Sequence, residues 1–546
     1  MLELSQLKLP CGTDRTMLES KIRKQLRLPA GAEMTYRITR HAVDARKKPV
    51  LWDVYTLQIQ LSSQKAEDRV LSKAGKAGTS LRRKEPVIYR FPAPEGEVLQ
   101  HPPVVVGFGP AGIFAGLMLA RAGYAPIILE RGQCMEERTR SVETFWESGA
   151  LDPDSNIQFG EGGAGTFSDG KLTSNVTDKA GRVQEVIETF IKAGAPEDIA
   201  YEQIPHIGTD RLRDVIRTLR GEICRLGGQI RFDTCVRDLS VENGRLQGLW
   251  IQTRGEESTA FLPAEAVILA PGHSARDTIR MLKCRNVPME AKNFAVGFRV
   301  SHPQQLINYS QYGISAPDEL ARLHLTPASY KLTARASDGR GVYSFCMCPG
   351  GFVVNASSEP KRLAVNGMSD YKRDAARANS AIVMTVDPKD FGGSSVLDGL
   401  AFQEKLEERA YALAAGSVPV QRFASFMAGQ MDAGIPSSRE LCIKGASAPA
   451  PLHTLLPADL TEDFKEGMQQ FGQKMPGYDG EDCYVIGLES RTSSPVRILR
   501  GEDGASRVAG LFPCGEGAGY AGGIMSAAVD GIRMAEKVAL RFRPAQ

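Results

Sequence analysis

Three glycines lie where a protein would hold the phosphates of a dinucleotide. Gly107, Gly109 and Gly112 directly follow the apolar run 104–106 and directly precede a helix-like run over 113–122. In a G-x-G-x-x-G segment of this kind, the first glycine allows a tight turn, the second lets backbone N–H groups approach a pyrophosphate, and the third lets helix and strand pack closely. The residues that we predict for this contact are Gly107, Gly109, Pro110, Ala111 and Gly112.

An acidic residue follows the next predicted strand. The strand is expected over 125–129, and Glu130 stands 23 residues after Gly107, followed by Arg131. A carboxylate in this position can accept hydrogen bonds from an adenosine ribose. We therefore predict that Glu130 and Arg131 contact the nucleotide. The alternative explanation of the whole motif, a Gly-rich turn in an unrelated α/β protein, is less favoured.

A second glycine-rich segment, over 510–524, indicates a flavin. It contains Gly515, Glu516, Gly522, Gly523 and Ile524 and precedes a predicted helix over 525–540. A carboxylate beside a glycine turn and a helix start can hold ribityl hydroxyls and the pyrimidine edge of a flavin. A protein that binds only a nicotinamide dinucleotide would not need this segment, although a turn with a packing helix is the simpler alternative.

Two further patches fit the same cofactor, FAD. The first, within 160–171, is expected to wrap the pyrophosphate and the isoalloxazine, and the second, within 267–273, is a strand that ends in a turn of small residues. Only one G-x-G-x-x-G segment, at 107–112, stands directly between an apolar run and a helix-like run; the same glycine spacing recurs at 160–165 and 517–522, within the patches assigned here to FAD. Electrons are therefore expected from an organic substrate or from NAD(P)H that docks without a fold of its own. The predicted cofactor contacts here are Gly163, Ala164, Gly165, Thr166, Ala270, Pro271 and Gly272.

Two cations are candidates for contacts to substrate or flavin. Arg491 could clamp a substrate carboxylate with two hydrogen bonds, or it could bind a flavin phosphate or a backbone turn. Lys171 and Asp169 could face flavin N5 or the C2 carbonyl, whereas helix capping is the alternative for Asp169. Arg491 and Lys171 are included among the predicted catalytic residues.

Three further side chains could take part in proton or electron transfer. His273 follows the turn at 270–272 and is the best-placed general base among seven histidines, with a structural role as the alternative. Cys346 and Cys348 are two residues apart and point the same way on a strand, so a redox role is conceivable; small buried packing residues are the favoured interpretation. No spacing of His, Cys and Asp indicates a metal site.

Motifs along most of the chain from residue 104 onward carry a family resemblance. They are the segments 163–171, 345–351, 366–369, 489–496 and 513–523. The sequence resembles FAD flavoproteins of the glutathione-reductase-like fold, and more closely a bacterial family of uncharacterised FAD-dependent dehydrogenases with an extra N-terminal domain. The resemblance implies non-covalent FAD, with Glu130 on the adenosine ribose, Val236 near adenine, and Glu516, Gly523 and Ile524 near the ribityl chain and flavin ring. Glu516 departs from the aspartate usual in the wider fold.

These motifs imply an α/β protein of several units. We predict a Rossmann-like FAD-binding domain in two parts, over 100–284 and 481–546, with an inserted mixed α+β substrate domain over 285–480. An N-terminal ferredoxin-like αβ domain is expected over 1–99, with a helix that carries Leu18, Ile22 and Leu26 on one face and two strands over 34–43 and 50–61. The function predicted is that of an FAD-dependent oxidoreductase, a dehydrogenase that moves hydride between flavin and an organic substrate.

Composition limits the partners and the location. The chain has 42% hydrophobic residues and a net charge of +3, with ten scattered cysteines and no leader-like apolar segment at its start. These features favour a cytoplasmic protein. The apolar stretch 104–129 is not expected to span a membrane, because it contains Arg121 and five glycines. The first hundred residues carry 19 Lys and Arg against 11 Asp and Glu. The favoured explanation of this excess of basic residues is that they keep the surface of the domain soluble. The alternatives are that Arg37, Arg40, Arg46, Lys47 and Lys48 bind an acidic protein partner, or bind RNA in an RNA-modifying flavoprotein.

Overall fold

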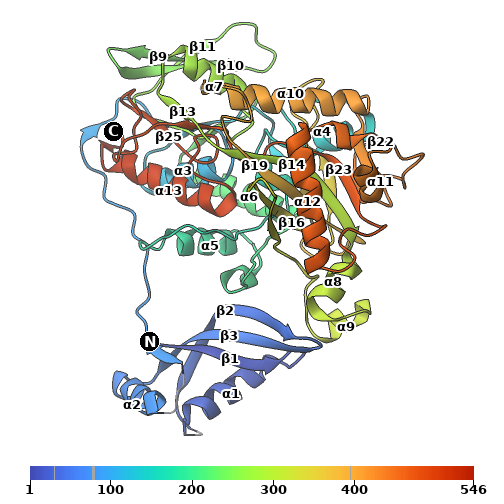
Figure 1. The fold of residues 1–546 in the computed structure, drawn as a ribbon. Helices are drawn as coiled ribbons and strands as arrows, with labels where there is room; N and C mark the ends of the chain where they lie inside the picture. The colour runs from blue at the N-terminus through green and yellow to red at the C-terminus, as the bar shows by residue number, and fades with distance from the viewer. Residues whose placement is uncertain (30, 77–79, 394, 546) are drawn as a thin grey trace.

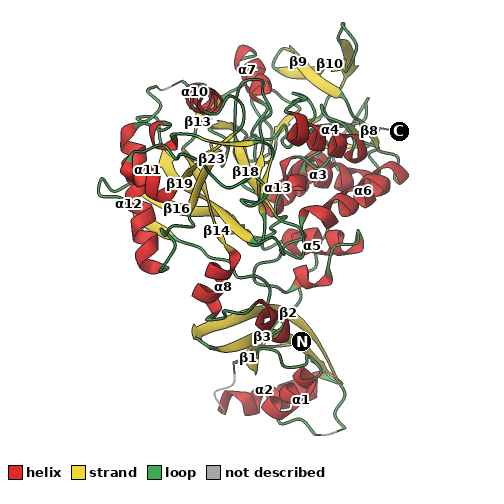
Figure 2. Ribbon diagram, turned by 90° about the vertical axis from the view of Figure 1, so that its right-hand side faces the viewer, coloured by secondary structure: helices red, strands yellow, loops and turns green. Residues whose placement is uncertain are grey.

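The computed structural model describes residues 1–29, 31–76, 80–393 and 395–545 of a mixed α/β protein. An N-terminal sheet with two helices stands apart at the bottom of Figure 1, and a long connection leads from it to the larger body. Figure 2 shows two groups of helices on opposite sides of this body. On one side are α3 (Pro110–Arg121), α5 (Arg182–Lys192) and α6 (Thr209–Arg225), and on the other are α11 (Phe423–Ala428) and α12 (Ala458–Lys474). Within the described ranges, no helix is long and apolar enough to span a membrane.

The N-terminal unit has the element order β-α-β-β-α-β. Its elements are β1 (Leu2–Pro10), α1 (Met17–Leu26), β2 (Met34–Lys47), β3 (Val50–Leu61), α2 (Gln64–Lys76) and β4 (Leu81–Arg83). The sheet order is β2-β3-β1-β4 with antiparallel neighbours, an order in which the two βαβ units are split as in ferredoxin-like folds. The predicted helix face is present, because Leu18, Ile22 and Leu26 of α1 are buried.

One strand of this unit is longer than predicted. Strand β2 continues through the basic stretch after residue 43, which we expected to separate two strands. A register shift between Asp44 and Lys47 lets the strand stay paired with β3 as far as Val50. The basic residues therefore lie on an edge strand, where charged side chains are common because they discourage further strand pairing.

A five-stranded parallel sheet carries the predicted nucleotide motifs. Its order is β25-β12-β6-β7-β8, with β6 at Val104–Val106, β7 at Ile127–Leu129, β8 at Gln229–Arg231, β12 at Val267–Leu269 and β25 at Leu511–Pro513. Strand β12 pairs in parallel with both β6 and β25. The C-terminal segment therefore returns to the sheet that begins with the glycine fingerprint.

Both faces of this sheet are buried at β6, β7, β12 and β25, which explains why these four strands are apolar, whereas the edge strand β8 carries Gln229 and Arg231 and is partly exposed. On one face pack α3 (Pro110–Arg121), α6 (Thr209–Arg225) and α13 (Ile524–Ala539). On the other face lies a three-stranded meander of β9 (Thr234–Glu242), β10 (Arg245–Thr253) and β11 (Ala260–Pro263). The helices predicted over 113–122 and 525–540 are thus present with ends shifted by a few residues.

The chain passes from the parallel sheet into the meander at residues 232–233. Residues 229–231 form β8 in the parallel sheet, whereas β9 begins at Thr234 in the meander. Asp233 has a φ of 50°, in the left-handed region, and this bend sends the chain from one sheet to the other. Strand β9 then pairs antiparallel with β10 in a hairpin.

A seven-stranded mixed sheet forms the other half of the body. Its order is β15-β16-β19-β14-β23-β20-β22, and its long central members are β14 (Phe294–Pro303), β19 (Arg377–Val386) and β16 (Gly341–Cys348). The remaining strands are β15 (Thr333–Arg335), β20 (Val418–Arg422), β22 (Ser447–Pro449) and β23 (Tyr484–Glu489). Because β23 pairs with β14 and β20, the boundary that we expected at residue 480 is too early.

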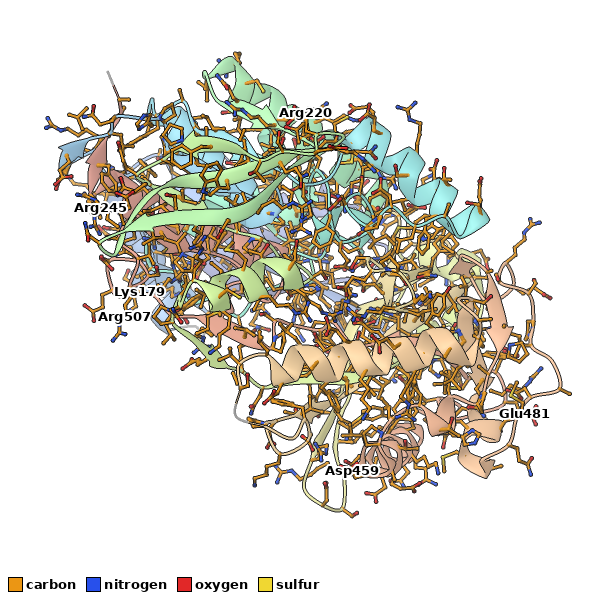
Figure 3. All side chains as sticks on the ribbon, turned by 90° about the horizontal axis from the view of Figure 1, so that it is seen from above. Lys179, Arg220, Arg245, Asp459, Glu481 and Arg507 are labelled. Atoms are coloured by element: carbon orange, nitrogen blue, oxygen red, sulfur yellow. The ribbon has the colours of Figure 1, made fainter. Side chains whose placement is uncertain are left out.

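Helices and a smaller sheet complete this half. They are α8 (Gln304–Tyr312), α9 (Pro317–Arg322), α10 (Asp398–Leu413), α11 (Phe423–Ala428), α12 (Ala458–Lys474), and the sheet of β17 (Phe352–Asn355), β18 (Val365–Met368) and β21 (Ile443–Lys444). The pair β13 (Met289–Ala291) and β24 (Val496–Ile498) lies where the chain crosses between the halves. Figure 3 shows the two halves from above: Arg220 and Arg245 belong to the parallel-sheet half, and Asp459 and Glu481 to the other.

Candidate cofactor and substrate site

A cavity of about 340 Å³ lies between the two halves, at the carboxyl ends of β6, β7, β12 and β25. Ligands of open α/β sheets bind at such strand ends, where turns leave backbone groups exposed. We call it the main cavity. Its lining includes most of the predicted residues: Gly107, Gly109, Pro110, Ala111, Glu130, Arg131, Gly163, Ala164, Gly165, Lys171, Val236, Ala270, Pro271, Gly272, His273, Cys346, Arg491, Gly515, Glu516, Gly522, Gly523 and Ile524.

Three predicted residues do not line the main cavity. A Cβ on Gly112 would lie 1.9 Å from the carbonyl oxygen of Gly107, so this glycine serves the packing of α3 on its own turn. Thr166 and Cys348 are buried, and the Thr166 hydroxyl donates to the carbonyl of Glu161 at 3.3 Å. The structure therefore gives no support to direct cofactor or substrate contact by Thr166 and Cys348, whereas Gly112 has the packing role that the fingerprint gives it.

The phosphate-type turn has the close backbone contacts that its glycines indicate. Gly107 has a φ of 95°, and a Cβ there would lie 2.2 Å from the carbonyl oxygen of Ala270. A Cβ on Gly163 would lie 3.0 Å from Gly109 Cα, so the two glycine segments approach each other directly. Gly109 precedes the first turn of α3 without a side-chain cap, which leaves N–H groups free for an anion.

The Glu130 carboxylate is largely occupied by the protein itself. It accepts hydrogen bonds from the backbone N–H groups of Phe108 at 2.8 Å and of Gly132 and Gly160, both at 2.9 Å. Three of its roughly four acceptor positions are thus used. Glu130 ties the glycine turn, the end of β7 and the 160–165 segment together, in addition to facing the main cavity.

The same end of the main cavity is lined by Arg131 and Val236. The Arg131 guanidinium donates to Asp277 at 2.9 Å and lies 4.4 Å from the ring centroid of Phe159. The guanidinium is therefore held by an ion pair and a cation–π contact rather than free to move. An apolar side chain with a flat cation beside it forms a surface that suits a planar base.

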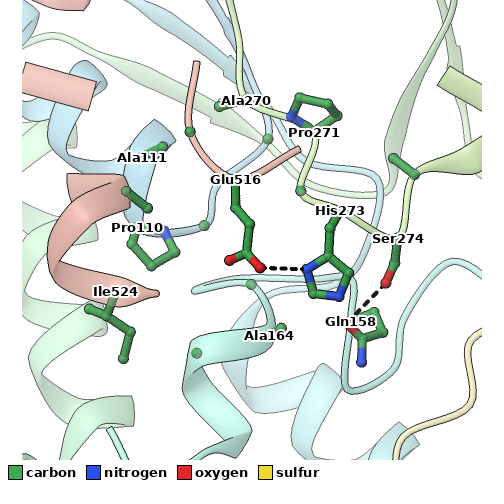
Figure 4. Close-up of a pocket in the computed structure, with 18 of the residues that line it drawn as sticks. Pro110, Ala111, Gln158, Ala164, Ala270, Pro271, His273, Ser274, Glu516 and Ile524 are labelled. Carbon is green, nitrogen blue, oxygen red and sulfur yellow. Dashed lines mark hydrogen bonds and ion pairs between the residues drawn. The ribbon is translucent and has the colours of Figure 1, made fainter. Parts of the chain in front are cut away.

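At the opposite end, His273 and Glu516 meet across the main cavity wall. Figure 4 shows the two side chains facing each other between the turn at Ala270–Pro271 and the start of α13 near Ile524. His273 Nδ1 lies 3.1 Å from Glu516 Oε1, and both side chains are mostly buried. His273 Nε2 is buried with no hydrogen-bond partner among the described residues. Glu516, expected at the ribityl chain, thus orients an imidazole whose other nitrogen is free for a ligand.

Arg491 lies in a buried ion-pair network and not in an open binding position. Its Nε and Nη2 donate to the two oxygens of Glu407 at 2.9 and 2.8 Å, and Nη1 donates to Ser274 at 3.1 Å and to Ser358 at 2.5 Å. A further contact of 3.5 Å joins Nη2 to Glu359, so all five donors have acceptors. Although Arg491 lines the main cavity, these contacts give no support to the prediction that it clamps a substrate carboxylate.

Glu407 is the centre of that network. Its side chain is fully buried and also accepts from Arg276 at 2.8 and 2.9 Å and from the Ser490 hydroxyl at 2.7 Å. Burial alone would raise its pKa, but the charges of Arg491 and Arg276 hold the pKa of this carboxyl far below its usual range. The ion pairs join α10, α7 (Arg276–Cys284) and the segment after β23, and so connect the two halves behind the main cavity.

Lys171 is a cation of the main cavity wall whose nearest carboxylate is already bound by another residue. The nearest one, Asp169, lies 3.5 Å away and is already bound by Arg373 at 3.0 and 2.5 Å. Although burial opposes it, the charges of Lys171 and Arg373 lower the pKa of Asp169. Asp169 therefore serves an ion pair and not the helix cap that we considered, and Lys171 adds positive charge to the main cavity.

Cys346 lies at a β-bulge on the main cavity wall. The register of β16 against β19 shifts between Phe345 and Cys348, and Cys346 has a φ of 45°. Such a conformation is costly for a non-glycine residue and is concentrated at functional sites. A hydrogen bond from the Cys348 thiol lowers the pKa of Cys346, with a smaller effect of the Lys171 charge, whereas the pKa of Cys348 is raised. Of the two cysteines, only Cys346 lines the main cavity.

The sequence did not indicate the group that organises this wall. Arg299 of β14 is fully buried and donates to Glu489 at 2.9 Å, to Asn366 at 2.9 Å and to the Cys346 carbonyl at 3.1 Å. These three residues line the main cavity. Arg299 lies in an apolar strand without a motif, so only the pairing of β14 with its neighbours reveals its role.

Glu489 is a second residue that we had not singled out. Its side chain is almost fully buried at the end of β23. Burial raises its pKa to about 7, against the lowering effect of Arg299. A buried carboxyl that titrates near neutral pH can hold and release a proton, and its place in the quoted 489–496 motif was the available signal. Among the described residues, no group of three or more potential ligands is gathered for a metal ion.

Comparison with protein families and curated proteins gives three findings. Residues 293–492 match a family model described as "FAD-dependent protein, C-terminal domain-like", which supports FAD as the cofactor. Residues 1–73 match a domain of unknown function, DUF8436. A protein of Clostridium beijerinckii (strain ATCC 51743 / NCIMB 8052), described as uncharacterized, is 42% identical over 548 residues, covering 99% of each chain.

Solved structures give weaker matches. A geranylgeranyl bacteriochlorophyll reductase-like protein of Thermoplasma acidophilum is 12% identical with a TM-score of 0.34, covering 82% of this chain and 79% of the other. The FrdA subunit of E. coli quinol fumarate reductase is 12% identical with a TM-score of 0.33, covering 81% and 70%. TM-scores at this level do not establish a common fold.

Proposed function

The chain belongs to the same family as the Clostridium beijerinckii relative, and we propose that it is an FAD-dependent oxidoreductase. The observation that carries this proposal is the pairing of β12 with both β6 and β25. It brings the starts of α3 and α13, far apart in the sequence, to one cavity. A glutathione-reductase-like arrangement of the FAD unit is part of the proposal.

The residues present fit an extended dinucleotide. Val236 and Arg131 would hold the adenine end, with Glu130 beside its ribose. The turn at 107–111 would hold the pyrophosphate with the first N–H groups of α3, because no side chain caps that helix. The glycines at 163, 165, 522 and 523, together with Ile524, would hold the flavin end. Close backbone approach, as between Gly109 and Gly163, is what such a cradle requires.

The side chains at the flavin end supply proton handling and charge. When bound, the flavin supplies the capacity to accept or donate a hydride. His273 presents an unpartnered Nε2 to the main cavity and is oriented through Nδ1 by Glu516. Glu489 can hold a proton near neutral pH, and Lys171 can bind an anionic group of a small or medium organic substrate. We therefore propose transfer of a hydride with a coupled proton, and a substrate held beneath the seven-stranded sheet.

Residues 1–99 are proposed to be a separate accessory unit, with FAD-binding segments over 100–284 and from about 490 onward. Several of the basic side chains of 1–99 are bound within the protein: Arg37 donates to Gln58 at 2.6 Å and Arg46 to Asp44 at 2.8 Å. Lys48 donates to the carbonyl of Ser310. We therefore do not propose RNA as a partner. A cytoplasmic location remains proposed, because reduced cysteines are typical of that compartment.

The colour of the purified protein tests this function. We expect a yellow protein whose FAD is released on denaturation, and we expect Gly163→Ala to weaken FAD binding at least tenfold, because Gly163 has a φ of 62° and faces Gly109. Gly194→Ala is the matched control: Gly194 also has a positive φ, of 102°, but a Cβ there would contact nothing. A colourless protein that takes up no added FAD would refute the proposal.

A further inference from the structure

A second cavity, of about 590 Å³, adjoins the main cavity. The two share Thr173 and Gly522 in their linings, so the second cavity opens beside the proposed flavin end. Its lining combines two lysines with hydroxyl-bearing residues and contains no aspartate or glutamate among the described residues. A hollow of this size with only positive charges in its wall suits an anionic ligand.

Neither lysine has a partner that neutralises it. Among the described residues, no hydrogen bond or salt bridge joins the ammonium group of Lys292 or Lys331 to an acceptor. Lys292 is half-buried, whereas Lys331 is exposed at the rim of the second cavity. Burial lowers the pKa of Lys292, as does the nearby Arg497, against the charge of Glu516. A cation that loses water without gaining a counter-ion is stabilised when a ligand brings negative charge.

The surrounding backbone adds to the same preference. The second cavity is lined by Gly519, Gly522 and Ser526, which bracket the first turn of α13. Gly522 lines both cavities and lies two residues before this 16-residue helix, so the positive end of the helix lies beside them. Two lysines, hydroxyl groups and a helix start together form the set of donors that proteins use to bind phosphate groups.

We propose that the second cavity binds the diphosphate of a reduced nicotinamide dinucleotide that delivers electrons to the flavin. This inference rests on the proposed function, because it needs FAD in the main cavity. The chemistry balances: the dihydronicotinamide gives up a hydride and becomes the oxidised nicotinamide, and FAD takes up that hydride and one proton to become FADH2. A donor held in this way needs no dinucleotide-binding unit of its own, and the other two segments with the G-x-G-x-x-G spacing, 160–165 and 517–522, contribute to the cavity proposed for FAD.

Binding to the FAD-loaded protein tests the inference without measuring turnover. NADP⁺, NAD⁺ and inorganic pyrophosphate are titrated by calorimetry at low salt. We expect one of the dinucleotides and pyrophosphate to compete for one site. We expect Lys292→Gln and Lys331→Gln each to weaken binding about tenfold, as for a lost charge-assisted hydrogen bond. Lys405→Gln, on the exposed face of α10, is the control and leaves binding unchanged.

The outcomes separate this inference from the proposed function. Yellow protein that binds neither dinucleotide nor pyrophosphate, or that binds them equally well in both lysine variants, would overturn the inference and leave the flavoprotein assignment intact. Lysine-dependent binding of pyrophosphate without binding of either dinucleotide would overturn the nicotinamide donor and assign the site to a phosphorylated substrate. Colourless protein would instead refute the function on which the inference rests.

Discussion

Replacing Arg491 by methionine should cost stability and should not specifically weaken substrate binding. The guanidinium has five acceptors within the protein and none of its donors is free. Removing one partner of a buried ion pair typically costs about 3–5 kcal/mol, because the other charge stays buried. Glu407 would keep two hydrogen bonds from Arg276 and one from Ser490, so we expect the lower end, about 3 kcal/mol.

Urea unfolding followed by tryptophan fluorescence measures this loss. Arg439→Met is the matched control: Arg439 is exposed, forms no ion pair with the described residues, and should change stability by less than about 0.5 kcal/mol. The reasoning would be refuted if Arg491→Met were as stable as Arg439→Met while the affinity for a substrate fell. That result would show that the guanidinium is available to a ligand after all.

The pH dependence of stability gives an independent check on the same ion pairs. The pKa of Glu407 is lowered in the folded protein from an ordinary value of 4.5. Its contribution to stability is therefore complete above that value and is lost as the pH falls below it. Arg491→Met should reduce this acid sensitivity, since a smaller lowering of the Glu407 pKa leaves less stability to lose.

Two further predictions concern other titratable groups. Burial alone would lower the pKa of His41, but hydrogen bonds to Asp53 and Glu202 raise it to about 9 from 6.5. The contact of β2 with the loop around Glu202 should therefore be fully stable below pH 6.5 and weaken as the pH rises through 9, which hydrogen exchange of that loop measures as a faster rate. His41→Asn should remove this pH dependence. The prediction would be contradicted if exchange in the wild type followed only the chemical pH dependence of the exchange reaction. Because the pKa of Cys346 is lowered, iodoacetamide at pH 7 should modify Cys346 before the two exposed cysteines. Lys171→Met should slow this reaction. If mass spectrometry finds the exposed thiols modified first, Cys346 is not a thiolate at this pH.

The nucleotide turn could be predicted because its determinants are local. Gly107 needs a positive φ, and Gly112 must let α3 pack on the turn just before it; both demands are met within six residues. Four of the five strands of the parallel sheet could be seen as short apolar runs because both of their faces are buried, whereas the edge strand β8 is partly exposed and polar at both ends. Strand β23 was assigned to the wrong part because its sequence fits either sheet, and only its pairing with β14 and β20 decides between them.

The roles of the charged side chains depended on partners far away in the chain. His273 and Glu516 meet although some 240 residues separate them, and Arg491 finds Glu407 on a helix of the other half. The residue pattern within one segment does not predict which distant side chains the fold will bring into contact with it. An arginine that binds a substrate and an arginine in a buried ion pair therefore have the same local sequence signal. The sequence by itself determined the glycine turns, the apolar strands and the residue types around the cavity, since these follow from backbone sterics and burial. Only the tertiary structure decided which donors remain free, because hydrogen bonds and ion pairs are satisfied by whichever groups the fold brings within reach.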